Sequence, residues 1–153
     1  MEIDNGITIP SVEALARRGV LVEDDGCSFC NEGIDSVSHI FTACPLALGL
    51  WEKISFWCCV RNFFVFSFKD LLELHSIGDR RKLEKEVLYG IIITACWILW
   101  KARNNLRFNG TNCNVEDIFS EVRATSFLWC KHRRFNGTKG KLAWADWCKF
   151  VNM

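Results

Sequence analysis

The 153-residue sequence lacks the motifs that mark the common enzyme classes. It contains no Gly-x-Ser-x-Gly, no phosphate-binding loop and no His-Glu-x-x-His. The paired aspartates of a polymerase palm are also missing, because the single tyrosine, Tyr89, is followed by Gly90 and Ile91. A Cys–His dyad stays open, since such pairs meet in space rather than in sequence. We expect this chain to have no catalytic activity of its own.

The sequence also has no apolar run that is long enough to cross a membrane. The longest run, Val87–Trp100, has 14 residues, whereas a membrane-spanning helix needs roughly 20. The first ten residues, MEIDNGITIP, do not combine a basic region with a following apolar region, as a secretory signal would. We therefore expect an intracellular protein, nuclear or cytoplasmic and not secreted, with no membrane partner. We interpret Val87–Trp100 as a helix that is apolar on nearly all sides and buried.

Charge is almost balanced overall but unevenly distributed. The net charge is +1, yet residues 1–100 hold 9 basic and 14 acidic residues, and residues 101–153 hold 10 and 4. A basic segment of this kind is typical of contact with RNA, DNA or another acidic partner, although a solvated helix face gives the same pattern. The candidate nucleic-acid-binding residues are Lys131, Arg133, Arg134, Lys139 and Lys141. Nearby aromatic residues could stack on bases, but for the tryptophans a place in the core is the favoured interpretation.

Nine cysteines are present, and their number is odd. An odd count in a chain without a secretory signal argues against a disulfide framework. In a reducing compartment, clustered cysteine and histidine residues are more often metal ligands than crosslinks. The adjacent pair Cys58-Cys59 lacks the spacing of a ligand pair, and we interpret it as part of the core.

One cluster has the spacing of a metal site: Cys27-x2-Cys30-x8-His39-x4-Cys44. Zinc takes four ligands in a tetrahedron and accepts thiolate and imidazole, and a shell closed by four protein ligands indicates a structural rather than a catalytic ion. His39 and Cys44 can converge only if their helix ends near Ala43, and proline after Cys44 favours such a break. The alternative is that these residues are buried cysteines and an ordinary core histidine. Four of them within 18 loop-rich residues favour zinc.

Helical periodicity dominates the rest of the chain, which predicts a mainly α fold. Capping residues and apolar spacing predict a short helix that Ser11 caps and Gly19 ends, and a long helix that Asp79 caps. Asn-Gly within Arg107–Thr111, a pentapeptide repeated identically at Arg134–Thr138, is predicted to end a helix with positive φ. The long helix is predicted at Arg80–Asn105, and the other helices at Val37–Ala43, Leu46–Val60, Val115–Arg133 and Leu142–Phe150. Between them, Phe63–Phe68 is interpreted as a short strand or a bridge between helices, and Phe68–His75 as one or two helical turns.

We predict two parts. Residues 1–60 form a small zinc-stapled module of loop or hairpin and helix, and residues 61–153 form a helical, bundle-like extension with a basic C-terminal part. A small loop-rich module of this kind cannot build a sufficient core alone, so the metal is expected to contribute to its folding.

Several of these motifs, in this order, resemble the zinc-binding domain that follows the reverse transcriptase in plant LINE-type (non-LTR) retrotransposons. The motifs that carry the resemblance are Ile9-Pro10-Ser11, Leu15-Ala16-Arg17-Arg18-Gly19, Cys27-Ser28-Phe29-Cys30, Ser36-Val37-Ser38-His39-Ile40-Phe41, Cys44-Pro45-Leu46-Ala47, Leu50-Trp51, the stretch from Trp97 to Asn105, and Phe108-Asn109-Gly110. The resemblance implies that Cys27, Cys30, His39 and Cys44 are the zinc ligands. It also implies that an RNA-directed DNA polymerase domain belongs upstream of this module, so that the chain is a detached C-terminal piece.

Three hypotheses about function follow. The first is a structural-zinc accessory module of a retrotransposon-type reverse transcriptase that binds nucleic acid and has no catalytic residues. The second is a protein-interaction module, in which aromatic residues around Trp97–Trp100 meet a reverse transcriptase domain or another partner; a large exposed apolar area there would favour it. The third is a non-functional retroelement remnant, which the sequence leaves open.

Overall fold

The computed structural model describes residues 11–21, 24–61, 63, 65–134, 147–148 and 151. These residues form helices, and no strand occurs among them, so the predicted mainly α fold is confirmed. In chain order the elements are α1 (Val12–Arg17), the π-helical turn η1 (His39–Ala43), α2 (Pro45–Trp57), α3 (Phe68–Glu73), the 3-10 turn η2 (Leu74–Ser76), α4 (Lys82–Asn109) and α5 (Val115–Arg134). The described residues between α2 and α3 form a bridge without regular structure. The helix predicted at Leu142–Phe150 lies, apart from Trp147 and Cys148, outside the described residues.

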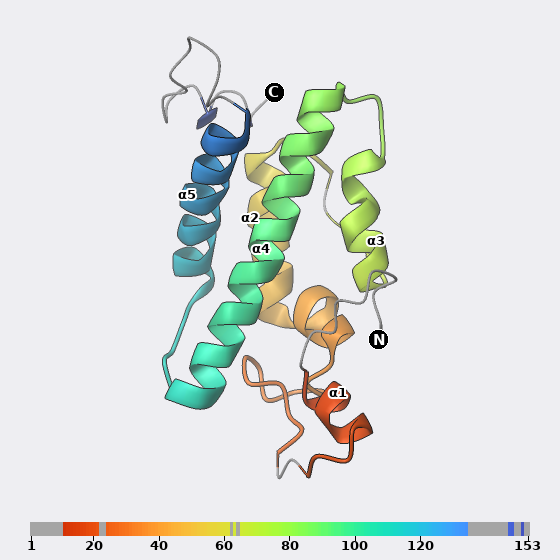
Figure 1. The fold of residues 1–153 in the computed structure, drawn as a ribbon, viewed down its shortest axis with the longest axis vertical. Helices are drawn as coiled ribbons and strands as arrows, with labels where there is room; N and C mark the ends of the chain where they lie inside the picture. The colour runs from red at the N-terminus through yellow and green to blue at the C-terminus, as the bar shows by residue number, and fades with distance from the viewer. Residues whose placement is uncertain are drawn as a thin grey trace.

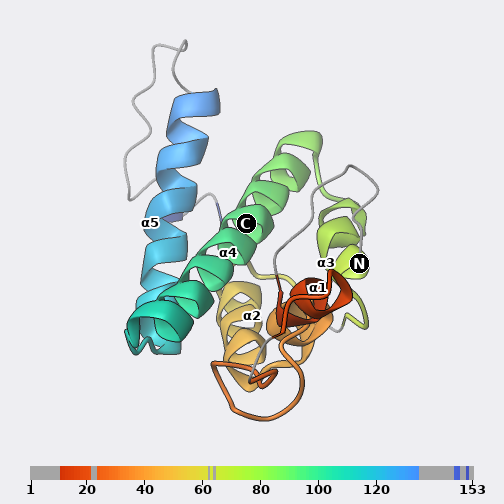
Figure 2. The same ribbon diagram turned by 60° about the horizontal axis from the view of Figure 1, so that its bottom comes forward.

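The two longest helices, α4 and α5, lie side by side and run in opposite directions (Figure 1). Helix α2 packs against α5 and η1, while α3 packs against α4 and η1. The close approach of α4 and α5 depends on Gly90, because a Cβ at that position would lie 2.5 Å from the ring of Trp129. Helix α1 and the loop that follows it lie at the bottom of Figure 1, at the end of the molecule where α4 ends, and Figure 2 brings this end forward.

The boundaries of α4 differ from the prediction at both ends. Arg81, not Asp79, is the N-cap residue, because Glu84 accepts hydrogen bonds from both the backbone and the side chain of Arg81. The helix continues past Asn105 to Asn109, where Gly110 ends it with φ of 63°. The predicted Asn-Gly termination is thus confirmed for the first copy of the repeat. The second copy lies, apart from Arg134, outside the described residues.

One hydrophobic cluster includes residues from α2, α3, η1, α4, α5 and the cysteine-bearing loop. Its largest buried side chain, Trp51, donates a 2.7 Å hydrogen bond from Nε1 to the carbonyl oxygen of Phe41, and so joins α2 to η1. Ile92 and Leu99 of α4 and Val122 of α5 are fully buried in the same cluster. The division at residue 60 stays a prediction.

The apolar segment of α4 is not buried on nearly all sides, contrary to expectation. Tyr89, Ile93 and Trp97 are 41%, 39% and 52% exposed. Their spacing of four residues places them on one helix face, opposite the buried face that meets the core. None of the helices in the described part of the chain combines the length and apolar character that crossing a membrane requires.

Candidate metal centre

The first two cysteines lie on a tight loop closed by backbone hydrogen bonds. The amide of Cys27 donates to the carbonyl of Gly33 at 3.0 Å, and the amide of Asn31 donates to the carbonyl of Cys27 at 2.8 Å. Asn31 adopts a left-handed conformation with φ of 55°, which asparagine tolerates better than most residues. The amide of Glu32 lies 3.4 Å from the sulfur of Cys30 and donates to it. These hydrogen bonds define the backbone conformation around both sulfurs.

The second pair of predicted ligands spans one π-helical turn. The amide of Cys44 donates to the carbonyl of His39 at 2.7 Å, which is the i→i+5 bond of a π-helix. In an α-helix, residues five apart differ by about 1.4 turns and point in different directions. The wider π turn brings His39 and Cys44 back to the same side. The helix then breaks at Cys44, whose ψ is 133°, and α2 begins at Pro45, as predicted.

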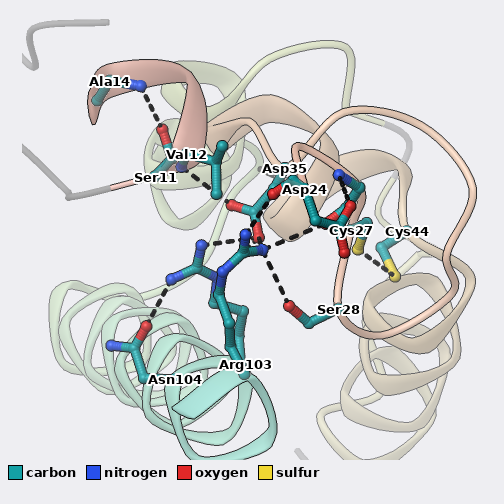
Figure 3. Close-up of polar contacts among 12 residues, drawn as sticks. Ser11, Val12, Ala14, Asp24, Cys27, Ser28, Asp35, Cys44, Arg103 and Asn104 are labelled. Carbon is teal, nitrogen blue, oxygen red and sulfur yellow. Dashed lines mark hydrogen bonds and ion pairs between the residues drawn. The ribbon is translucent and has the colours of Figure 1, made fainter. Parts of the chain in front are cut away.

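The four ligand atoms come together in space. All of them lie within 4.8 Å of one another. The sulfurs of Cys27 and Cys44 are 4.0 Å apart, and the sulfur of Cys30 is 3.3 Å from Nε2 of His39 (Figure 3 shows the Cys27–Cys44 pair). Zinc bonds of about 2.1 Å to nitrogen and 2.3 Å to sulfur place tetrahedral ligands about 3.5–3.8 Å apart. The three sulfurs and one imidazole nitrogen can therefore hold one metal ion.

Electrostatics at the cluster favour negatively charged sulfur. The hydrogen bond with Cys44 lowers the pKa of Cys27 to about 5. The same bond, followed by burial, raises the pKa of Cys44, while the amides of Leu46 and Ala47 at the start of α2 act in the opposite direction. The two pKa values move in opposite directions because one contact favours thiolate at Cys27 and thiol at Cys44. Thiolates are the metal-ligating form of cysteine, so Cys27 is the sulfur of this pair that is already suited to a cation.

Gly33 leaves space for the imidazole of His39. A Cβ at this position would lie 3.0 Å from Nδ1 and 3.1 Å from Cε1 of that ring, and φ of Gly33 is +76°. Both the close contact and the left-handed backbone require glycine. The residue therefore positions the ring without contributing a ligand.

A buried ion-pair network lies directly beside the metal loop. Asp35 is fully buried, and its Oδ2 accepts hydrogen bonds from the guanidinium of Arg103 at 2.8 Å (Figure 3). Its other oxygen accepts from the amide of Val12 at 3.4 Å. Arg107, one turn further along α4, lies 3.4 Å from the same Asp35 oxygen and donates to the carbonyls of Asp24 and Gly26. One carboxylate thus joins α1, the metal loop and the C-terminal part of α4.

Sequence reasoning missed this network. Arg103 lies two residues before the predicted end of the long helix at Asn105, but α4 continues to Asn109 and Arg103 is only 2% exposed. A signal was present, because Arg103 follows Leu99 by four residues and so continues the buried face of α4. A cation in that position requires a buried acid as its partner.

The structure places Lys131, Arg133 and Arg134 at the C-terminal end of α5, away from the metal cluster (Figure 1). Lys131 and Arg133 are exposed, and their charged groups lie 5.7 and 5.4 Å from the ring centroids of Phe127 and Trp129. Arg134 is the last residue of α5. Lys139 and Lys141 lie outside the described residues. That these five residues contact nucleic acid stays a prediction.

The cysteines outside the cluster have different surroundings. Cys58 is buried, and burial raises its pKa to about 12. Cys59 is exposed and has φ of 50°, so the interpretation of this pair as core is wrong for Cys59. The reason is that α2 ends at Trp57 and the chain turns outward directly after Cys58. The core interpretation is confirmed for Trp147, which is 1% exposed.

Comparison with curated proteins finds a plant relative. A protein of Arabidopsis thaliana that carries the name ribonuclease H protein is 30% identical to this chain over 88 residues, or 57% of the chain. The match covers 14% of that protein, so the chain spans only a small part of its length. No family model matches the sequence, and no solved structure matches it. The chain is therefore similar to a limited part of a longer plant protein.

Proposed function

We propose that this chain is an accessory module of a retrotransposon-type reverse transcriptase, that one structural zinc ion holds its N-terminal part together, and that it binds nucleic acid without catalytic residues of its own. The observation that carries the proposal is the convergence of Cys27, Cys30, His39 and Cys44 to within 4.8 Å. Three thiolates and an imidazole are a ligand set that zinc prefers. With four protein ligands, the zinc ion would supply a closed tetrahedral crosslink and leave no position for a reacting water.

Two further observations support a role with nucleic acid. The plant relative carries the name ribonuclease H protein, and this chain corresponds to a small part of it. In α5, all the acidic residues lie before Arg123, and the charged residues from there to the end of the helix are basic. Cations of this kind neutralise phosphates and release counterions, which makes binding dependent on salt.

A binding titration across salt concentration tests the nucleic-acid part. Replacing Arg133 and Arg134 together by glutamate should weaken binding to a labelled RNA or DNA and flatten the dependence of log K on log salt. The matched control replaces Arg17 and Arg18, an adjacent pair in and just after α1, by glutamate and should leave binding nearly unchanged. Equal affinities for the wild type and the Arg133/Arg134 variant at low salt would contradict the proposal.

The proposed absence of catalysis has its own test. Because the plant relative carries the name ribonuclease H protein, the purified chain is incubated with a labelled RNA–DNA hybrid and a divalent cation. We expect no cleavage above that of the buffer. Cleavage that a purified Cys30→Ser variant loses would assign the chain a reaction that the proposal excludes.

The exposed apolar face of α4 favours a second candidate, the protein-interaction module. Tyr89, Ile93 and Trp97 form a stripe, and Leu128 of α5 is 51% exposed. Exposed apolar patches often mark protein contacts. In this candidate function, the module docks on the rest of a longer polyprotein through this stripe. Trp97→Ser should then weaken its binding to the separately produced remainder of the Arabidopsis relative. The control, Leu21→Ser, changes a residue that is 99% exposed elsewhere on the molecule and should leave this binding unchanged.

A further inference from the structure

An open groove runs between α2 and α5, on a side of the molecule that the metal cluster does not use. Its volume is about 1240 Å³, which exceeds the roughly 300–1,000 Å³ typical of small-molecule sites. The residues that line it include Phe56 and Trp57 from α2 and Phe119 and Arg123 from α5. The groove is large enough for an extended ligand.

Aromatic rings and cations alternate along one face of α5, of which Phe119 and Arg123 line the groove. Phe119, Arg123, Phe127 and Lys131 follow one another at intervals of four residues, so they share one helix face. The guanidinium carbon of Arg123 lies 5.7 Å from the ring centroids of both Phe119 and Trp57, and Lys131 lies 5.7 Å from that of Phe127. Across the groove, Phe56 is 88% exposed, which leaves a ring face free for stacking. Aromatic rings for bases and cations for phosphates are what single-stranded nucleic-acid grooves combine.

Two buried polar atoms belong to residues that line the groove. The hydroxyl of Ser55 and the Nε1–H of Trp57 have no hydrogen-bond partner among the described residues, although these residues are 1% and 8% exposed. An unpaired buried donor is destabilising. Both atoms lie below the groove surface, so contacts to a ligand come from the exposed ring of Phe56 and from Arg123.

The charges give the groove a direction. At its end near the start of α5, Lys53 is paired with Glu116 at 2.5 Å, and Glu52 is close by. Toward the other end, the charged residues of α5 from Arg123 to Arg134 are all basic. Phosphates are therefore favoured beside Arg123 and, beyond the groove, toward Lys131, and they are disfavoured beside Glu52 and Glu116.

We propose that the α2–α5 groove binds a short single strand of RNA or DNA, with a base stacked on Phe56, a phosphate beside Arg123, and the strand continuing beyond the groove toward Lys131. This proposal rests on the proposed nucleic-acid function and names the form of its ligand. A single strand is favoured over a duplex because stacking on Phe56 needs an unpaired base. It is favoured over a peptide because the cations of this face of α5 recur at the spacing of its rings.

The test measures the anisotropy of short fluorescent oligouridylate, oligothymidylate and a duplex of mixed sequence, titrated with the full zinc-loaded chain. Phe56→Ala should weaken binding of the single strands by about tenfold, as expected for the loss of one stacked base. Arg123→Gln should reduce the slope of log K against log salt by about 0.7, the value for one phosphate contact on a single strand. Phe66→Ala, at a position 95% exposed that does not line the groove, is the matched control and should change nothing. The two single strands report whether the groove distinguishes RNA from DNA.

The outcomes separate the two proposals. One outcome overturns the groove assignment alone: the wild type binds single strands, the Arg133/Arg134 reversal weakens this binding, and Phe56→Ala leaves it unchanged. The nucleic-acid function then stands. If the wild type binds none of the three probes, both are overturned. Photocrosslinking of 4-thiouridine in the oligouridylate gives a readout that does not depend on variants. Crosslinks in α2 or the Phe119–Arg123 stretch support the groove, and crosslinks confined to other parts of the chain overturn it.

Discussion

Residues 24–44, which form the metal loop with η1, and the α4–α5 pair both contribute side chains to the core, but different interactions hold them in place. The α4–α5 pair buries Ile91, Ile92, Leu99 and Val122 against other apolar side chains. The metal loop instead positions sulfurs, an imidazole and the buried carboxylate of Asp35. The comparison teaches that the helices can form by apolar packing, whereas the loop depends on polar partners that must all be present.

The largest expected effect comes from removing a metal ligand. Cys30→Ser should release the ion and unfold the metal loop, because binding of structural zinc is worth about 10–16 kcal/mol and is coupled to folding. Hydrogen exchange should show lost protection over residues 24–44, with protection retained in the middle of α4. Cys59→Ser, at an exposed cysteine outside the cluster, is the control and should keep both metal and protection. Equal loss of protection in the metal loop and in α4 would mean that the metal holds both regions and not the loop alone.

The next effect is expected at the network that joins the two regions. Asp35→Asn removes the charge that Arg103 faces and leaves a buried cation unpaired, which costs about 3–5 kcal/mol. Chemical denaturation should show this loss, and zinc affinity should fall with it, because the loop is no longer held to α4. Asp25→Asn, at the exposed aspartate whose carbonyl accepts the amide of Asp35, is the control. A variant of Asp35 with wild-type stability would show that the ion pair contributes nothing.

A smaller effect should appear only in the helices. Gly90→Ala places a methyl group against the ring of Trp129 and should destabilise the protein by about 1–3 kcal/mol. Zinc content should not change. The matched control is Gly49→Ala in α2, where the nearest atom, in Val115, would lie at an ordinary 3.6 Å. That change should stabilise by up to about 1 kcal/mol through helix propensity. A loss of metal in Gly90→Ala would remove the distinction between the regions.

The smallest effect is expected at the surface of the same helices. Lys101 and Glu121 form an exposed ion pair at 2.9 Å between α4 and α5. Exposed pairs contribute about 0–1 kcal/mol and are screened by salt. Lys101→Ala should therefore lower thermal stability slightly at low salt and by less at high salt. A loss of several kcal/mol would show that polar contacts hold the helices as well as the loop.

The sequence predicts much of this arrangement and misses identifiable parts. Periodicity and capping predict the helices well, since those signals are local, as Ser11 and Gly110 show. The metal site could also be predicted, because its four ligands lie within 18 residues of one another and the proline that follows Cys44 is next to them. The contact between Asp35 and Arg103 spans 68 residues, and local patterns do not encode such pairing. The exposed side of Trp97 was missed because an apolar run does not reveal which of its faces another element covers.

Native mass spectrometry of the purified chain tests the central claim most directly, namely that Cys27, Cys30, His39 and Cys44 hold one zinc ion that keeps the metal loop folded. The account predicts one zinc ion per wild-type chain and none in Cys30→Ser. Chelation of the wild type should expose residues 24–44 to hydrogen exchange in the same way as the variant. A wild-type chain without bound metal that still protects this loop would contradict the account.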